Sequence, residues 1–320
     1  MQPLLALASL LLLVACDRVD DRPRTPFDGA RALEYVQAQL AFGPRVPGTE
    51  GHRRAGDWIA EQMRQRADTV VEQRWIHVTT SGDSLPMRNI LARYRPGATE
   101  RILYVAHWDT RPVADSDRNL GNRQQPIPGA NDGASGVALL MALGDQLAAA
   151  PPNVGVDLLF VDGEDYGSFD DPNLNDVLIG AHHFATNLPD SAYRPMFGVV
   201  WDMIGDANLE LWQEGHSLQA APEVVARVWQ TAADLGYGDV FVNRPLGYAI
   251  TDDHLPLINA GLRVIDVIDI CYAAPQRGCP PSPAAPETNY HHTMQDTIDK
   301  VSARSLQVVG DVALTLIRQL

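Results

Sequence analysis

The spacing of apolar and polar positions predicts helices and strands that alternate along most of the chain. Apolar residues recur at helical spacing on both sides of a turn-rich segment, 43–51, and again in 133–148, 178–186, 222–235 and 302–320. Runs of strand length cover 70–79, 89–94, 101–107, 156–161, 197–203 and 263–268. Strands that alternate with helices indicate a mostly parallel sheet, with room for antiparallel early strands at one edge. We therefore expect an α/β fold: a single three-layer domain whose mixed, mostly parallel central sheet is covered by helices.

The first residues have the pattern of an export signal. Residues 3–15 are apolar but too few to span a bilayer, and the run stops at Cys16. The sequence Leu13-Val-Ala-Cys16 resembles the bacterial lipoprotein signal, in which the cysteine becomes the acylated N-terminus. We expect a signal segment in 1–15, a charged tether in 16–27 and a catalytic domain in 28–320, exported and anchored by lipid to a bacterial membrane. Because no Lys or Arg precedes the apolar run, secretion without an anchor is the alternative.

Composition and charge narrow the classes of function. The 320 residues, 45% of them hydrophobic, suffice for one large domain, and nothing in the middle has the composition of a linker. A net charge of -15 argues against nucleic acid as a partner, since binding phosphates requires a basic face. Export implies an oxidising compartment, so Cys271 and Cys279 are a candidate local disulfide, with two unpaired thiols as the alternative.

Two adjacent carboxylates follow the apolar strand 156–161. Glu164 and Asp165 come directly after a turn at Gly163, and open α/β sheets place their ligand sites at the carboxyl ends of strands. Two acids at that edge need a cation, and the glycine turn allows one to bind metal while the other faces a substrate. Taken alone, the pair is also compatible with a solvated loop.

Histidines and further carboxylates stand just after other strands or just before helices. They are His107, Asp109, Asp132, Asp202, Asp206, His291 and His292. Each has a structural alternative when it is taken singly; Asp132, for example, is also placed to cap a helix. Together they form the nitrogen and carboxylate donor set that zinc prefers, whereas structural zinc sites are more often closed by thiolates. The set therefore favours a catalytic zinc site.

Six motifs, in this order along the chain, resemble those of a known superfamily. They are Ala106-His-Trp-Asp109, Gly129-Ala-Asn-Asp-Gly-Ala-Ser-Gly136, Asp162-Gly-Glu-Asp165, Asp202-Met-Ile-Gly205, Asp252-Asp-His254 and His292-Thr-Met-Gln-Asp-Thr297. The superfamily is that of the zinc aminopeptidases with co-catalytic metals and their relatives, the animal-type glutaminyl-peptide cyclotransferases. The chain resembles most a bacterial glutaminyl cyclase-like lipoprotein, and the resemblance covers 28–320. Carried over by position, it implies a zinc ion held by Asp132, Asp165 and His292, with Glu164 as the acid-base residue.

The two branches of that superfamily differ in a second group of residues. The resemblance to the cyclotransferases implies one zinc, with Asp202 and Asp252 as a hydrogen-bonded acid pair near the substrate amine. The resemblance to the aminopeptidases implies a second zinc held by His107 and Asp202, with Asp132 bridging the two ions. Both branches act on peptide N-termini: one cyclises N-terminal Gln to pyroglutamate and releases ammonia, and the other hydrolyses the first peptide bond. A zinc-binding lipoprotein without turnover is the third hypothesis, against which the presence of Glu164 argues.

Local details favour the cyclotransferase. The segment 160–165 resembles its Phe-Asp-Gly-Glu-Glu stretch, and 251–257 resembles its stretch with two Asp, His and Pro. Three positions depart from the cyclotransferase pattern: Asp165 replaces a Glu ligand, His291 stands where a pocket Trp is expected, and Asp266 stands where a His is expected. The Gly-rich turn around Asp132 looks more like the peptidase version.

Overall fold

The computed structural model of the chain describes residues 24–272 and 289–320. Its strands are β1 (Thr69–Val78), β2 (Ser84–Tyr94), β3 (Arg101–His107), β4 (Gly155–Val161), β5 (Phe197–Asp202), β6 (Leu211–Gln213), β7 (Phe241–Pro245) and β8 (Val264–Ile268). Its helices are α1 (Gly29–Leu40), α2 (Glu50–Arg64), α3 (Ala134–Ala149), α4 (Ile179–Thr186), α5 (Gly215–Ala220), α6 (Pro222–Asp234), α7 (His254–Asn259), the short 3-10 helix η1 (Ile298–Lys300) and α8 (Ala303–Arg318). Each expected segment forms an element of the expected type, although β2 begins five residues before 89.

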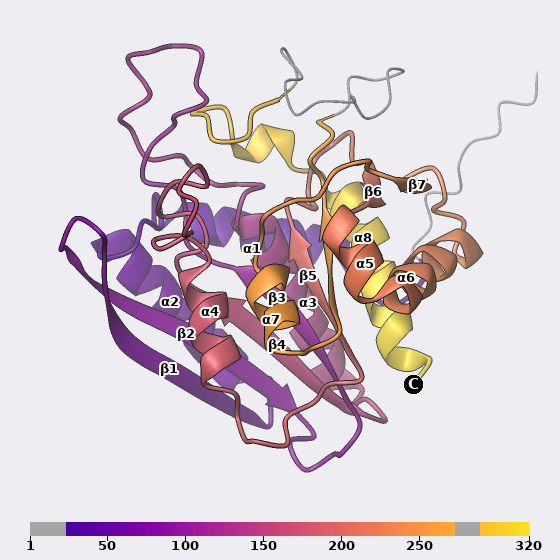
Figure 1. Ribbon diagram of the computed structural model, residues 1–320. Helices are drawn as coiled ribbons and strands as arrows, with labels where there is room; N and C mark the ends of the chain where they lie inside the picture. Colours follow the sequence, from indigo (N-terminus) through magenta and orange to yellow (C-terminus); the bar gives the residue numbers. More distant parts are fainter. Residues whose placement is uncertain (1–23, 273–288) are drawn as a thin grey trace, which may run out of the picture.

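Six strands form one mixed sheet in the order β1-β2-β4-β3-β5-β8. The pairs β1/β2 and β2/β4 are antiparallel, whereas β4, β3, β5 and β8 run parallel. The expected fold class is therefore confirmed, including the antiparallel early strands at one edge (Figure 1).

Helices cover both faces of this sheet. Side chains on one face, such as Tyr104, pack with α1, α2, α3 and α8 in the larger core. Side chains on the other face, such as Leu103 and Val105, pack with α4 and α7. Figure 1 shows α4 and α7 in front of the sheet and α3 behind it. Every residue of β3 and β4 is buried between these layers, and both strands are mostly apolar on both faces rather than alternating.

Five short elements were not expected from the sequence. The strands β6 and β7 form a separate parallel pair, α5 and α7 have six residues each, and η1 has three. Their apolar residues are too few and too mixed with polar ones to show a period of either kind. Two of these elements, α5 and α7, nevertheless lie beside the acidic residues described below.

The expected tether, 16–27, enters the described part of the chain only at 24–27. There it lies against α8: the backbone N–H and the hydroxyl of Thr25 both donate to Asp311, and Phe27, 2% exposed, packs against Gly310. The expected signal segment, 1–15, the rest of the tether with Cys16, and Cys279 lie outside the described residues. Of the helices in 24–272 and 289–320, none is long and apolar enough to cross a membrane.

Candidate metal centre

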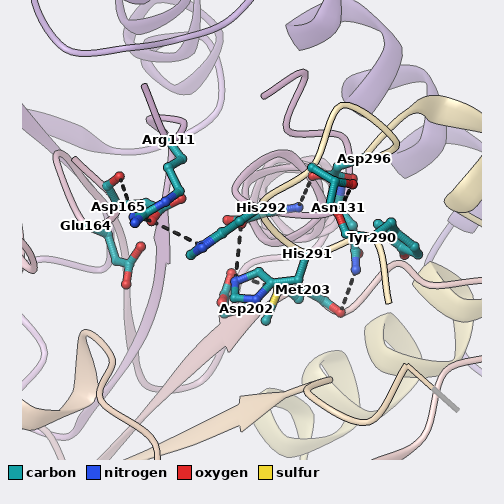
Figure 2. A network of polar contacts seen from close by, with 12 residues as sticks. Arg111, Asn131, Glu164, Asp165, Asp202, Met203, Tyr290, His291, His292 and Asp296 are labelled. Carbon is teal, nitrogen blue, oxygen red and sulfur yellow. Dashed lines mark hydrogen bonds and ion pairs between the residues drawn. The ribbon is translucent and has the colours of Figure 1, made fainter. Parts of the chain in front are cut away.

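The expected site residues meet at the carboxyl edge of the parallel strands. The candidate catalytic residues and the residues implied as metal ligands are buried, with at most 8% of each exposed, whereas the side chain of His291 is 26% exposed. β3 ends at His107 and β5 at Asp202, β4 is followed by Glu164 and Asp165, and the loops that lead into α3 and α8 carry Asp132 and His292. Residues separated by nearly two hundred positions thus share one site because the strand ends coincide (Figure 2).

One group of donor atoms surrounds the side chain of His292. Its Nε2 lies 3.2 Å from Asp165 Oδ1 and 3.6 Å from Asp132 Oδ2. The neighbouring His291 joins this group, because its Nε2 lies 3.7 Å from the same oxygen of Asp132. The donor atoms of Asp132, His291 and His292 all lie within 4.8 Å of one another, close enough to hold one ion, and Asp165 adjoins them through His292.

A second group surrounds the side chain of His107. Its Nε2 lies 3.2 Å from Asp132 Oδ1 and 3.1 Å from Asp202 Oδ1. These three donors also lie within 4.8 Å of one another. Asp132 therefore presents one carboxylate oxygen to each group, which is the arrangement that a carboxylate bridging two metal ions requires.

The chemistry of these donors fits a divalent cation. Within the described part of the chain, the buried oxygens Asp132 Oδ2 and Asp165 Oδ2 have no hydrogen-bond partner. Burying carboxylates without compensating charge is costly, and here Glu164 and Asp202 add two more acids to the same site. Imidazole nitrogens and carboxylate oxygens are the ligands that zinc takes in catalytic sites. The residues present therefore suit zinc.

The turn that carries Asp132 is fixed from a distant segment. The side chain of Asp296 accepts hydrogen bonds from the backbone N–H groups of Asn131, at 2.8 Å, and Asp132, at 3.0 Å. Gly133 has a φ of +89°, and a Cβ there would lie 2.6 Å from the carbonyl oxygen of Asp109. The glycine allows the chain to enter α3 with Asp132 facing the site. The role of Asp296 was not predicted, although the residue stands in one of the six motifs.

Two residues that were not predicted from the sequence, an arginine and an aspartate, contact the expected metal ligands. Arg111 donates through Nη1 to Asp165 Oδ1 at 2.7 Å and through Nη2 to Asp115 Oδ2 at 2.6 Å. Asp115 Oδ1 in turn lies 3.7 Å from His292 Nδ1. The Arg111–Asp115 pair thus contacts both Asp165 and His292 and can orient these two side chains.

Glu164 is suited to hold and release a proton. Burial raises the pKa of its carboxyl group well above the ordinary value; the charge of His107 opposes the shift, and those of Asp165 and Asp252 add to it. Its loop is held by Asp109, whose carboxylate accepts from the backbone N–H of Glu164 at 3.1 Å and of Asp165 at 3.2 Å. Asp109 Oδ1 also lies 3.4 Å from His107 Nδ1.

The acid pair expected at Asp202 and Asp252 is part of a larger buried cluster. Burial raises the pKa of Asp202 to about 7, against the opposing effect of His107, and the charge of Asp252 contributes to the increase. Burial and the charge of Asp252 also raise the pKa of Asp266 well above the ordinary range. Both carboxylate oxygens of Asp266 and one of Asp252 are buried without a hydrogen-bond partner among the described residues.

Several other polar residues lie outside the two donor groups. His254 faces Glu214 Oε2 at 3.3 Å and Asp266 Oδ2 at 3.9 Å. Asp206 bridges to Val301, and His183 stacks on Trp75. Cys271 is disulfide-bonded, and its candidate partner Cys279 lies outside the described residues.

Solved structures similar to this chain are zinc exopeptidases and glutaminyl cyclases. The glutaminyl cyclase of Porphyromonas gingivalis is 37% identical, with a TM-score of 0.83 over 92% of this chain and 99% of that one. A leucine aminopeptidase precursor from Bacteroides thetaiotaomicron is 33% identical, with a TM-score of 0.82 over 93% of this chain and 100% of that one.

Curated relatives match over a shorter part of their own length. A probable zinc metalloprotease from Pyricularia oryzae is 33% identical over 158 residues, which are 44% of this chain and 30% of the relative. The first five such relatives are matched over half of their length or less. The model of peptidase family M28 matches residues 89–317, which include all the metal-centre residues described above. The chain therefore belongs to peptidase family M28.

Proposed function

We propose that this M28 zinc enzyme is a glutaminyl-peptide cyclotransferase, which converts the N-terminal Gln of peptides to pyroglutamate and releases ammonia. The observation that carries the proposal is the likeness to the glutaminyl cyclase of Porphyromonas gingivalis, which extends over 99% of that chain. The local resemblance of 160–165 and 251–257 to cyclotransferase segments supports the same choice.

In this proposal, Asp132, Asp165 and His292 hold one zinc ion. When bound there, zinc polarises the carbonyl of the substrate's side-chain amide. Asp202 and Asp252 hydrogen-bond the substrate's α-amine and orient its nitrogen toward the amide carbon. Asp202 and Asp252 are buried, 6% and 2% exposed, which suits a pocket that binds the α-amine of the substrate and shields it from water.

Glu164 moves the proton in both halves of the reaction. Its carboxylate takes a proton from the α-amine as the amine nitrogen bonds to the side-chain amide carbon and closes the five-membered ring. The bond from that carbon to the amide nitrogen then breaks, and Glu164 returns the proton to the departing nitrogen, which leaves as ammonia. The raised pKa of Glu164 supports this role, because such a carboxyl group binds the proton firmly enough to carry it between the two nitrogens.

A metallo-aminopeptidase is the second candidate. The observation that favours it is the position of Asp132, whose two oxygens face separate donor groups at His107 and at His292. In that reaction Glu164 would take a proton from a water molecule that attacks the first peptide carbonyl, and would then protonate the departing amine. A zinc-binding protein without turnover is the third candidate. Such a protein would not need an acid-base residue at position 164, so the presence of Glu164 argues against it.

Zinc content and two assays on the purified protein separate these candidates. One zinc per chain, with ammonia released from a Gln-peptide and no cleavage of a Leu-anilide, is the expected result. Two zincs per chain, with release of free leucine or of the anilide product, would overturn the cyclotransferase in favour of the aminopeptidase. A protein that binds zinc and turns over neither substrate would support the third candidate.

We also propose that the enzyme acts outside the cytoplasm, anchored through acylated Cys16. The apolar run before Cys16 and the Leu-Val-Ala-Cys sequence support this. Replacing Cys16→Ser should move the protein from the membrane fraction to the soluble exported fraction. An unchanged distribution would contradict the lipid anchor and leave secretion without an anchor as the explanation.

A further inference from the structure

Two neighbouring histidines point at the same carboxylate oxygen. His291 Nε2 lies 3.7 Å and His292 Nε2 3.6 Å from Asp132 Oδ2, an oxygen that is buried and without a hydrogen-bond partner among the described residues. Ligand atoms about 2.0–2.2 Å from a tetrahedral zinc are about 3.3–3.6 Å from one another. The separations of both imidazoles from Asp132 are therefore close to those of two ligands of one ion.

The backbone at this point is shaped to bring both rings to one side. Successive side chains of an extended chain point in opposite directions. His292 instead has a φ of +55°, in the left-handed region that residues other than glycine rarely adopt. As a result the two ring centroids lie only 3.6 Å apart, tilted by 39°, and both Nε2 atoms face Asp132. Strained backbone of this kind persists where the surrounding structure holds it, and it gathers at ligand-binding sites.

The ring of His291 is also held on its other side. Tyr272, which is fully buried at 1% exposure, stacks on it with centroids 6.2 Å apart and an angle of 22° between the planes. The backbone N–H of His291 donates to Asn289 Oδ1 at 2.8 Å. Ring and backbone are therefore fixed with Nε2 toward Asp132, as the orientation of a metal ligand requires.

We propose that His291 is an additional ligand of the metal ion held by Asp132, Asp165 and His292. The proposal rests on the zinc centre of the proposed function, but not on which of the two reactions the enzyme performs. The ion would then have two adjacent imidazole donors and two carboxylates from the chain. Since catalytic zinc can accept a fifth ligand, substrate would bind by expanding the coordination.

The test compares zinc binding in the full-length protein with that of His291→Phe and His291→Ala. The phenylalanine variant retains a ring to stack on Tyr272 and lacks only the donor atom, so it separates ligation from packing. His183→Ala is the matched control, because this histidine lies on α4 and stacks on Trp75, away from both donor groups. Competition with a chelator measures zinc affinity, and the visible spectrum of the cobalt-substituted protein reports the number and type of ligands. Thermal unfolding of the metal-free proteins shows whether each variant is folded.

Both variants should bind zinc at least about tenfold more weakly than wild type, since even indirect partners of metal ligands contribute that much. The cobalt spectrum should change in both, and the control should match wild type in each measurement. Wild-type zinc affinity and an unchanged cobalt spectrum in folded His291→Phe would overturn the proposal, as would an increase in KM for the Gln-peptide with zinc affinity unaltered. Absence of zinc binding by the wild type would instead refute the zinc centre on which the proposed function rests.

Discussion

Single residues in the site serve more than one neighbour, and Arg111 illustrates this. It contacts Asp165 directly and reaches His292 through Asp115. We expect Arg111→Ala to weaken zinc binding about 10–100-fold, because partners of metal ligands typically contribute that much. Lysine should restore only part of the affinity, since it does not hold two carboxylates in fixed geometry as a guanidinium does. Chelator competition measures the effect, with exposed Arg123→Ala as the control. Tighter zinc binding by Arg111→Ala would show that charge repulsion outweighs positioning.

Glu164 is the residue whose removal should separate binding from turnover. We expect Glu164→Gln to lower kcat at least about 100-fold, the usual contribution of a general acid-base residue, while zinc content stays at the wild-type value. Steady-state ammonia release and metal analysis measure the two quantities. Glu223→Gln is the control, since that acid pairs with Arg263 on the surface. Retention of activity in Glu164→Gln would exclude the proposed proton transfer.

Among the secondary-structure elements, the strands of the central sheet could be predicted from the sequence, whereas the short helices and strands and the supporting contacts of the site could not. The strands 101–107 and 156–161 were expected at or near their observed bounds because each contains an apolar run of strand length. The donors at strand ends could also be expected, since they follow those runs directly. Asp296 and Arg111 could not, because their roles depend on contacts with Asn131 and Asp165 that only the folded chain creates.

The short helix α5, which was not expected, depends on one buried carboxylate. Glu214 caps it by accepting from the backbone N–H groups of His216 and Ser217, and it also accepts from Ile250. Burial alone would raise the pKa of Glu214, but the hydrogen bond and charge of His254, with these backbone donors, lower it to about 2.

Because the folded-state pKa of Glu214 lies below the unfolded value, its stabilisation is present above about pH 4.5 and is lost as pH falls toward about 2. We expect Glu214→Gln to lower the free energy of unfolding at pH 7 by up to about 3 kcal/mol, with the difference from wild type narrowing at acid pH. Denaturant titrations at several pH values measure this. Glu34→Gln, at an exposed pair with Arg31, should have little effect at any pH. If the difference in the free energy of unfolding between wild type and Glu214→Gln were the same at every pH, Glu214 would stabilise the protein through packing and not through its charge.

For the whole molecule, the metal ion should contribute to stability. Buried carboxylates from the loop after β4, the end of β5 and the loop before α3 face one another in the site, so their repulsion opposes folding when no cation is bound. A ligand at 100 times its Kd stabilises the native state by about 2.7 kcal/mol. We expect chelation to lower Tm by several degrees and added zinc to restore it. His292→Ala, which removes an expected ligand, should have a Tm that chelators do not change. Equal wild-type Tm values with and without zinc would contradict a bound ion.

The central claim is that loops following separate strands of one sheet hold a zinc ion beside a free acid. The most direct measurement is a crystal structure of the zinc-loaded protein with diffraction recorded on both sides of the zinc absorption edge. The expected result is an anomalous peak about 2.0–2.2 Å from donor atoms of Asp132, Asp165 and His292, with the carboxylate of Glu164 near the ion but not bound to it. A peak elsewhere, or none in crystals of protein that contains zinc, would contradict the claim.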